Sequence, residues 1–410
     1  MTTIDGSDVY QARWRMLALL ALGYVSLTLN WFNIASAFTP ISDDLGVTFA
    51  QLAMLIALFV LGYGVAHVPG GILAARYGMK RTLVAGMLLQ GVGAILSGFA
   101  IGFIDLALYR VIAGVGASIV IAVGVGAVSV WFRDREINLA LGVTSGAAFS
   151  TGVILGLYAC IYLTEAAGWR GMLIICGVLN IVLAAAVASW FRTPPGVGGL
   201  AGGKISRAGL VQALVDKQLW IYGIAMVGVY GAYFTASQLL GTYAVEQRGF
   251  TAGEGGMLGA VFAFAGIPGA LIGGKISDLI RNYRVVIVVP LLAMGGLLAA
   301  IPVAPDWVLW GVSFAVGFLF CFSFPAWVCV PAAVSKVDPE QVGTAVGVML
   351  TLAAVGGFVV PVVFGYVVPE FGFGVGWTAV AAISLLTGVV GLVGKKRADH
   401  PVLIETVAAS

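Results

Sequence analysis

Residues 104–131 read IDLALYRVIAGVGASIVIAVGVGAVSVW, an apolar run interrupted by one acid, Asp105, and one base, Arg110. A helix rises 1.5 Å per residue, so about 20 such residues cross the hydrocarbon core of a bilayer. The rest of the chain has a similar composition, because 60% of its 410 residues are hydrophobic and only 10% are charged. Its mean hydropathy is +1.05, whereas soluble domains carry about a quarter charged residues. The sequence therefore predicts an integral membrane protein.

Apolar runs of this length occur twelve times between charged or Pro/Gly-rich breaks. Each run must form a helix, because lipid cannot satisfy the polar groups of an open backbone edge. The predicted spans are 16–39, 50–74, 82–102, 104–131, 137–163, 169–191, 219–244, 254–276, 285–304, 307–334, 342–368 and 374–394. The predicted fold class is thus an all-α membrane protein with twelve transmembrane helices.

A Pro/Gly-rich stretch at 192–217 divides these spans six and six, and its composition is that of a linker. Small residues recur in the two halves at an offset of 202 to 205 positions, as in Gly114 with Gly317 and Gly152 with Gly357. Parallel repeats leave such an internal symmetry. We therefore expect two pseudo-symmetric six-helix bundles, residues 1–195 and 218–410, joined by a cytoplasmic linker at 196–217.

The basic residues predict the orientation of the spans. If the N-terminus lies in the cytoplasm, 18 of the 21 Lys and Arg residues fall in inner segments, as the positive-inside rule requires. We therefore expect a multi-pass protein of the cell (plasma) membrane with both termini cytoplasmic.

Several classes of function are disfavoured by the residue inventory. No basic run is interleaved with aromatic residues, so nucleic acid is not an expected partner. The four cysteines follow no metal-binding spacing, and His67 and His400 are the only histidines. No Gly-x-x-x-x-Gly-Lys phosphate loop occurs, so ATP hydrolysis is not expected. We predict no metal, no cofactor and no enzymatic activity.

Two motifs carry a family resemblance. The loop after the second span reads GILAARYGMKR at 71–81, and the fourth span carries Arg-x-x-x-Gly-x-Gly at 110–116. Together with twelve spans and a central linker, these patterns resemble the major facilitator superfamily over essentially the whole chain. The resemblance implies a transporter whose two bundles rock about a central substrate site. It also implies a cytoplasmic gate motif comprising Gly71, Arg76, Gly78, Lys80, Arg81 and, from the second half, Asp278. In the family, an acid of this motif pairs with basic residues across the interface between the bundles. Ala75 stands at that position here, so Asp278 is expected to carry more of this pairing.

Ionisable residues within a membrane are functional candidates, and all 18 acids fall at termini, loops or span ends. Arg110 is expected ~10 Å from the outer end of its span, where its planar fork suits a carboxylate. Its alternative role is donation to carbonyls of a neighbouring helix. His67, ~13 Å from the inner end, is the candidate for proton coupling, and its alternative role is a hydrogen bond between helices.

Polar and aromatic residues are mixed most richly in the first, seventh and tenth spans. Pockets for small molecules combine aromatic walls with a few polar groups, although helix–helix hydrogen bonds use the same residues. Pro325 in the tenth span is expected to break or kink its helix. The predicted substrate-binding residues, besides Arg110, are Asn30, Trp31, Asn33, Tyr230, Tyr233, Gln238, Phe324 and Trp327.

These observations favour a secondary active or facilitative transporter that works by alternating access. The deep positive charge favours a small organic anion, such as a monocarboxylate, as substrate. The alternative is efflux of amphipathic drugs or metabolites, and a remote alternative is a non-transporting sensor or polytopic enzyme. Partners are expected to be the substrate and the lipid bilayer, with protons as a candidate coupling ion. We expect a monomer that exchanges its substrate or facilitates its movement, any proton travelling on the substrate or on His67.

Overall fold

The computed structural model describes residues 6–132, 136–193, 211–212, 214–280, 282–335, 337 and 342–396. Almost all of these residues are helical, and the described ranges contain no strand. Packing divides the chain into two units. Unit 1 comprises Met1–Gly202 with Thr235–Phe264, and unit 2 comprises Gly203–Phe234 with Ala265–Ser410. The division into bundles at 1–195 and 218–410 stays a prediction.

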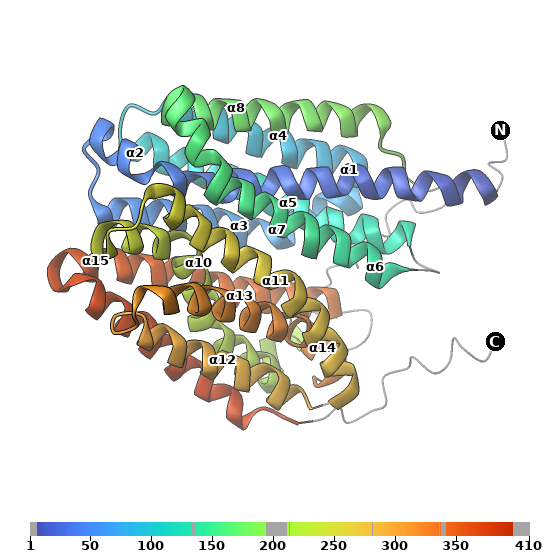
Figure 1. Ribbon diagram of the computed structural model, residues 1–410. Coiled ribbons are helices and arrows are strands. Elements are labelled where there is room, and N and C mark those ends of the chain that lie inside the picture. The colour runs from blue at the N-terminus through green and yellow to red at the C-terminus, as the bar shows by residue number, and fades with distance from the viewer. Residues whose placement is uncertain are drawn as a thin grey trace. The chain divides into compact units, whose positions relative to one another are not determined.

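Unit 1 contains the first six predicted spans and parts of α10 (Lys217–Arg248) and α11 (Ala252–Ile280). Its helices α1, α3, α4, α5 and α8 lie side by side (Figure 1). The most extensive contacts join α3 to α5, α4 to α5 and α4 to α8. The elements are α1 (Gly6–Phe32), η1 (Asn33–Ala37), α2 (Phe38–Leu45), α3 (Phe49–Tyr77), α4 (Met79–Gly98), α5 (Phe103–Trp131), α6 (Ile137–Leu141), η2 (Gly142–Ala148), α7 (Phe149–Ile154), η3 (Leu155–Ala159) and α8 (Cys160–Trp190).

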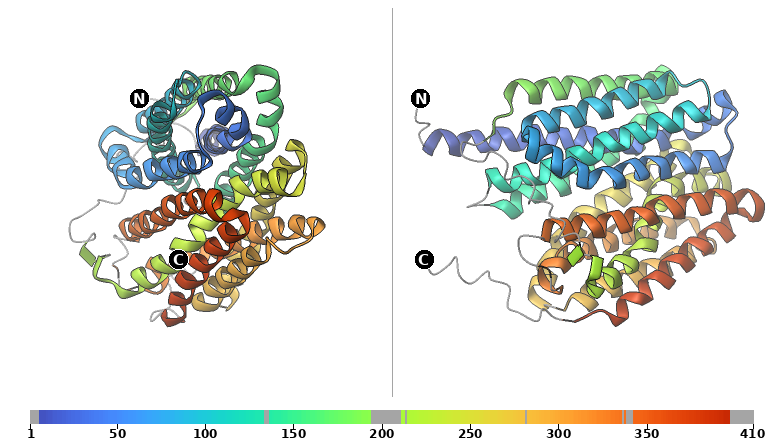
Figure 2. Two further views of the ribbon diagram at one scale, coloured as in Figure 1. Left: turned by 90° about the vertical axis from the view of Figure 1, so that its left-hand side faces the viewer. Right: turned by 180° about the vertical axis from the view of Figure 1, so that it is seen from behind.

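Unit 2 contains the remaining helices and the other parts of α10 and α11. Within it, α12 packs on both α13 and α15, and Figure 2 shows these helices from two further sides. The elements are α10 (Lys217–Arg248), α11 (Ala252–Ile280), α12 (Tyr283–Ala300), α13 (Asp306–Val328), α14 (Val330–Ala333), α15 (Val342–Val390) and η5 (Gly391–Val393).

Ten continuous helical stretches among the described residues are long and apolar enough to cross a membrane. Two of them, Leu139–Trp190 and Thr344–Val393, have 52 and 50 residues, or about 75–78 Å if straight. Each is interrupted by a glycine with positive φ, Gly168 at 71° and Gly372 at 82°. A side chain rarely adopts this conformation, so each glycine marks the turn between two spans. The predicted all-α membrane fold is confirmed.

The first span differs from its prediction as one continuous helix over 16–39. The α-helix ends at Phe32, a 3₁₀ segment follows from Asn33 to Ala37, and α2 then runs to Leu45. The fifth span is also irregular, because π-helical turns occupy Gly142–Ala148 and Leu155–Ala159. Such departures from α geometry are frequent where a helix serves a function.

Glycines bring α3 and α5 into close contact. A Cβ added at Gly114 of α5 would lie 2.1 Å from the Phe59 carbonyl oxygen, and one at Gly62 of α3 would lie 2.3 Å from the Val111 carbonyl oxygen. Contacts this short are not compatible with a side chain. The two backbones therefore meet along a seam, the α3/α5 seam, which carries the candidate site described next.

Candidate functional site

The break in the first span is capped by Arg110. Carbonyls at a helix C-terminus lack intrahelical partners, and at the end of α1 those of Asn30 and Trp31 accept from the guanidinium. Arg110 donates from Nη1 to Asn30 O at 3.0 Å and from Nη2 to Trp31 O at 2.8 Å. The structure therefore gives Arg110 the carbonyl-donor role that the sequence left open. Its binding of an anion stays a prediction.

The charge of Arg110 lacks an ionic partner in the described part of the chain. Its side chain is 2% exposed, its Nε has no hydrogen-bond partner, and no carboxylate lies within ion-pair distance. The Cζ atom lies 4.5 Å from the Phe59 ring centroid, which adds a cation–π contact. The end of α1 offers only about half of a negative charge. A buried cation with neutral partners is costly, so this position favours an incoming anion.

An aromatic column connects Arg110 to His67 along α3. Residues four apart share one helix face, and Phe59, Tyr63 and His67 have this spacing. Trp31 stacks on Phe59 at 4.9 Å between centroids and packs on Tyr63 at 4.6 Å. Tyr63 then meets the His67 ring edge-to-face at 4.3 Å. The predicted residues Trp31, Arg110 and His67 therefore belong to one contiguous cluster in unit 1.

His67 is 8% exposed, and its two ring nitrogens have different surroundings. Nδ1 lies 2.8 Å from the Tyr63 carbonyl oxygen and 2.9 Å from Ser118 Oγ. A carbonyl oxygen can only accept, so Nδ1 carries the hydrogen of the neutral imidazole and Nε2 carries a lone pair. Nε2 is buried and has no hydrogen-bond partner among the described residues. The site thus contains an unused proton acceptor inside the membrane.

Asn30 belongs to α1 and Asn33 to η1, and both of these elements pack against α8. Asn30 Nδ2 donates to Ser26 O at 2.9 Å and to Cys176 O at 3.2 Å, which are helix-packing contacts. Asn33 is completely buried, and neither atom of its amide makes a hydrogen bond of good geometry to a described residue. Contact of either side chain with substrate stays a prediction.

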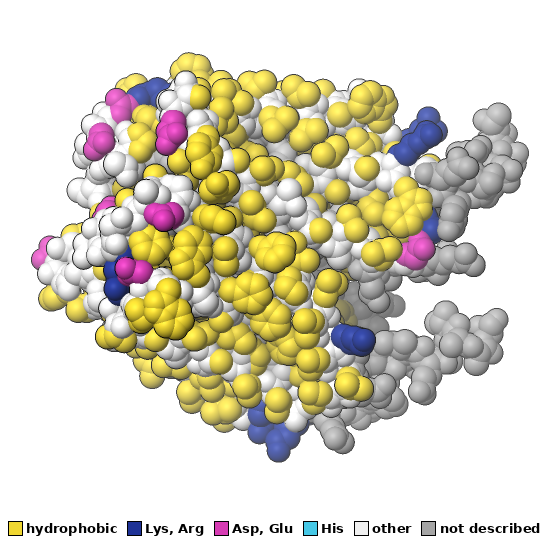
Figure 3. Space-filling view, in the orientation of Figure 1, with side chains coloured by type: hydrophobic (Ala, Val, Ile, Leu, Met, Phe, Trp, Pro, Cys, Tyr) yellow, Lys and Arg dark blue, Asp and Glu magenta, His cyan; other side chains and the backbone are white. Residues whose placement is uncertain are grey.

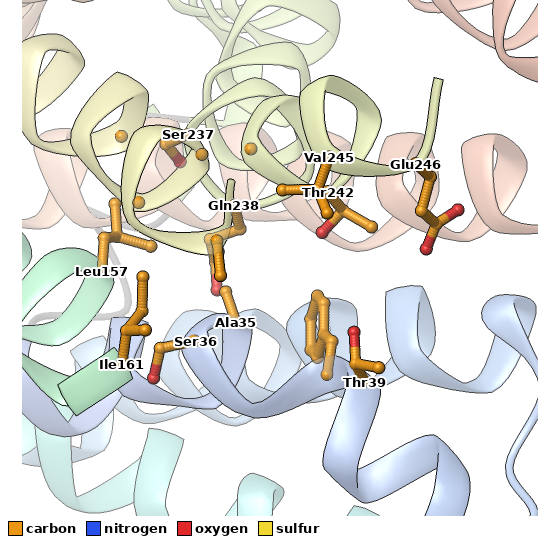
Figure 4. Close-up of a pocket in the computed structure, with 16 residues that line it drawn as sticks. Ala35, Ser36, Thr39, Leu157, Ile161, Ser237, Gln238, Thr242, Val245 and Glu246 are labelled. Atoms are coloured by element: carbon orange, nitrogen blue, oxygen red, sulfur yellow. The ribbon is translucent and has the colours of Figure 1, made fainter. Parts of the chain in front are cut away.

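A pocket in unit 1 contains Gln238 but none of the other predicted substrate residues. Figure 4 shows side chains of α10 facing those of η1, α2 and the fifth span across it. The sequence analysis assigned no site role to the other polar residues, although Gln238, Thr242 and Glu246 repeat every four positions and so share one helix face. The polar side chains of its lining are Ser36, Thr39, Ser237, Gln238, Thr242 and Glu246.

In unit 2 the predicted aromatic residues form a row through Phe320, which the sequence analysis missed. Tyr233 stacks on Phe320 at 4.0 Å, Phe320 contacts Phe324 at 5.7 Å, and Phe324 contacts Trp327 at 5.6 Å. Tyr230 lies 6.0 Å from Phe320. The spacing of positions 320, 324 and 327 is the signal that could have indicated this row.

Two further details of unit 2 concern the side chain of Trp327 and the helix around Pro325. Trp327 is fully buried and donates from Nε1 to the Tyr222 carbonyl oxygen at 2.8 Å, so its polar atom is already used in packing. The predicted break at Pro325 is displaced, because α13 continues through this residue and ends at Val328.

Most residues of the predicted cytoplasmic gate motif lie at or beside the tight turn between α3 and α4. Gly78 has φ of 84° and ψ of 154°, a conformation that favours glycine, while α3 ends at Tyr77 and α4 begins at Met79. A Cβ at Gly71 would meet nothing within 4 Å among the described residues. Arg76 and Arg81 are exposed and Lys80 is half-buried, so the bases remain accessible. The side chain of Asp278 lies outside the described part of the structure.

The fold is that of a polytopic membrane protein, and comparison with known proteins identifies its family. The model of the Major Facilitator Superfamily matches residues 20–361. The chain belongs to the Major Facilitator Superfamily, which confirms the resemblance seen in the motifs. It is therefore a transporter of small molecules and not an enzyme.

Individual relatives are similar over nearly their full length. The probable sulfoacetate transporter SauU of Cupriavidus necator is 25% identical, covering 88% of this chain and 89% of that protein. The D-galactonate transporter of Escherichia coli is 23% identical, covering 93% and 95%. A crystal structure of a bacterial homolog of the human lysosomal transporter Spinster, inward-facing and unoccupied, has a TM-score of 0.78 at 16% identity, covering 93% and 96%. At that identity the structural likeness shows the fold alone.

Proposed function

We propose that the protein carries a small organic anion, such as a monocarboxylate, across the cell membrane by alternating access. The observation that carries the proposal is the Arg110 guanidinium, buried and bonded to two neutral carbonyls with no described carboxylate beside it. A substrate carboxylate or sulfonate would supply the missing charge and could use the planar fork. The names of the sulfoacetate and D-galactonate transporters support this substrate class.

The number of cations in the site favours one negative charge on the substrate. Arg13, another buried cation among the described residues, pairs with Glu136 at 2.6 Å and is thereby neutralised. The position in the second half that aligns with Arg110 is Ser313, which brings no charge. A single guanidinium balances a monoanion such as D-galactonate better than a dianion such as sulfoacetate, which carries both a sulfonate and a carboxylate.

The aromatic row of unit 2 supports the second candidate, efflux of amphipathic drugs or metabolites. Tyr233 stacks on Phe320, and Phe320 contacts Phe324 in a tilted arrangement; aromatic surfaces of this kind bind apolar or cationic molecules. The two candidates differ in the charge of the ligand, so one binding experiment separates them.

That experiment is thermal unfolding of the purified protein with a panel of ligands. The panel comprises sulfoacetate, D-galactonate, lactate, a neutral sugar, a neutral amino acid and a cationic amphipathic drug. We expect stabilisation by anions alone, since a ligand at 100 times its Kd adds about 2.7 kcal/mol to the free energy of unfolding. Stabilisation by the drug and by no anion would replace the first proposal with the second. Uptake of the stabilising anion into proteoliposomes then tests transport.

We also propose that the protein is a monomer of the plasma membrane with both termini cytoplasmic. On the face of unit 1 seen in Figure 3, acidic side chains gather mainly at one end of the helices, and the excess of Lys and Arg in the opposite segments supports the orientation. A green fluorescent protein fused to the C-terminus is expected to fluoresce, and alkaline phosphatase at the same position is expected to be inactive. An active phosphatase fusion would reverse the topology, and cross-linking of the purified protein tests the monomer.

A further inference from the structure

The turn that follows α15 and η5 is held against the start of α12 by hydrogen bonds to its backbone. Arg284 donates from Nε to the Gly394 carbonyl oxygen at 2.8 Å, and its Nη2 donates to the same oxygen. The Tyr283 amide donates to the Lys396 carbonyl oxygen at 3.0 Å. Residues 394–396 therefore have a fixed position, although they lie outside any regular helix.

The start of α10 binds the same turn. The Tyr222 hydroxyl donates to the Lys395 carbonyl oxygen at 2.6 Å, and the Lys395 amide donates to Gln218 Oε1 at 2.8 Å. Lys217 directly precedes Gln218 and is exposed. Three elements of unit 2 thus bring four bases together. We name them the basic cluster, which comprises Lys217, Arg284, Lys395 and Lys396.

The basic cluster carries an excess of positive charge. Within the described ranges, Lys217, Arg284 and Lys396 form no ion pair with a carboxylate. The neighbouring acid Asp216 accepts from the Gln218 amide at 2.7 Å, so it caps the start of α10. Figure 3 shows Lys and Arg side chains gathered at this end of α12 and α15. Like charges that are held together repel each other, so an anion bound among these bases would stabilise the turn.

Exposed apolar side chains continue from the basic cluster along two of its helices. Val285 and Val289 on α12 are 44% and 57% exposed, and Trp220 and Ile224 on α10 are 39% and 37% exposed. Residues four apart share one helix face, so each pair forms an apolar strip that begins beside a base. Both helices are long and apolar enough to cross a membrane, and Trp is enriched at the membrane interface. The surface therefore combines cations at the helix ends with apolar groups further along.

We propose that the basic cluster binds the headgroup phosphate of an anionic phospholipid, such as phosphatidylglycerol, whose acyl chains lie on the two apolar strips. The lysine ammonium groups and Arg284 Nη1, which is not used in the bonds to Gly394, would donate charge-assisted hydrogen bonds to the phosphate. The bound lipid joins α10, α12 and the turn after α15, and so stabilises unit 2. A soluble phosphate would contact the bases alone and would leave the apolar strips unused.

The first test is native mass spectrometry of the purified protein with phosphatidylglycerol and phosphatidylcholine at equal concentrations. Both lipids carry acyl chains and a phosphate, but the choline group is a cation that the basic cluster repels. We expect the wild type to retain phosphatidylglycerol in preference to phosphatidylcholine, and to keep it in an excess of glycerol 3-phosphate. Equal retention of the two lipids would overturn the inference. Displacement by glycerol 3-phosphate would also overturn it, because the cluster would then be a site for soluble phosphates.

The second test combines Lys217→Gln with Lys396→Gln, and its matched control combines Arg15→Gln with Arg192→Gln in unit 1. All four side chains are exposed, so neither double variant disturbs buried packing. A base near an anionic lipid contributes about fivefold in affinity, so the first double variant should lower the preference for phosphatidylglycerol about 25-fold. It should also lose the rise in unfolding temperature that this lipid gives the wild type, whereas the control should keep both properties. Equal losses in the two double variants would mean that overall positive charge, and not the basic cluster, binds the lipid.

Discussion

Replacement of Arg110 by Gln is expected to reduce anion affinity by roughly 30- to several thousand-fold. Truncating one member of a buried, hydrogen-bonded charge pair costs about 2–5 kcal/mol. The substrate anion would lose its cation and both arms of the fork. Arg110→Lys should fall between the wild type and Arg110→Gln, because an ammonium retains the charge and loses the planar geometry. Binding is measured by calorimetry with whichever anion of the panel binds, and transport by uptake into proteoliposomes.

The same substitution has a structural effect that must be separated from binding. Arg110→Gln also removes the two donors to Asn30 O and Trp31 O, and a buried acceptor left without a partner costs about 1–3 kcal/mol. The ligand-free melting temperature should therefore fall. If that temperature falls and the anion affinity does not, Arg110 is only the cap of α1, and the anion proposal loses its support.

Arg170 offers a matched control for this experiment. It also bears a guanidinium, which pairs with Asp44 and stacks on the Trp169 ring at 4.2 Å. Its side chain is 41% exposed, and exposed pairs contribute little to stability. Arg170→Gln removes one positive charge beside Asp44. Its anion affinity should therefore stay close to that of the wild type.

The transmembrane spans were predictable from sequence wherever the length of an apolar run alone determined them. The predicted span 104–131 corresponds to α5, Phe103–Trp131, and the predicted span 50–74 corresponds to α3, Phe49–Tyr77. In both, a long apolar run defines the middle, and turn residues or charges define the ends. Gly168 falls between the predicted spans 137–163 and 169–191, and its φ of 71° marks the turn there.

The break at Asn33 was not predictable from local sequence. The segment Asn33–Ala37 contains neither Pro nor Gly, so it carries no local signal for ending a helix. Among the described residues it is Arg110, 79 or 80 positions away in the chain, that binds the exposed carbonyls. A pattern in one helix cannot reveal a cap supplied by another.

The glycines of the fifth span show the same limit: the sequence shows their spacing but not the helix that each of them contacts. Their spacing indicates close helix contacts, and Gly152 and Gly156 do meet α1, at the Val25 and Leu29 carbonyls respectively. A Cβ at Gly142 or Gly146 would meet nothing within 4 Å among the described residues. The sequence shows which residues are small, and the contacts in the fold show at which of these positions a side chain would not fit.

For part of the candidate site, the sequence could likewise predict which residues are candidates but not how they are arranged. The composition indicated His67 and Arg110 as isolated ionisable residues in apolar spans. Their shared seam follows from α3 and α5 packing in parallel through Gly62 and Gly114. The protonation state of the His67 nitrogens follows from Tyr63 O and Ser118 Oγ, which is geometry that no spacing rule supplies.

Gly114→Ala is expected to destabilise the fold and to abolish transport, because it separates the two helices that carry the site. The added Cβ would lie 2.1 Å from Phe59 O and 3.1 Å from Tyr63 N. Backbone atoms cannot rotate away, so α5 must shift by ~1 Å or more, and overpacking of this kind costs about 1–3 kcal/mol. That shift also moves Arg110 relative to the end of α1, which lengthens both of its hydrogen bonds.

The measurement is thermal unfolding of Gly114→Ala in detergent, followed by size-exclusion chromatography and by uptake into proteoliposomes. Gly296→Ala is the control, because Gly296 is exposed in α12 and a Cβ there meets nothing within 4 Å among the described residues. Helix propensity alone favours Ala over Gly by about 1 kcal/mol, so this control should be unchanged or slightly more stable. A Gly114→Ala protein as stable and active as Gly296→Ala would mean that the α3/α5 seam tolerates separation. Alignment of Arg110 and His67 along it would then not be required for transport.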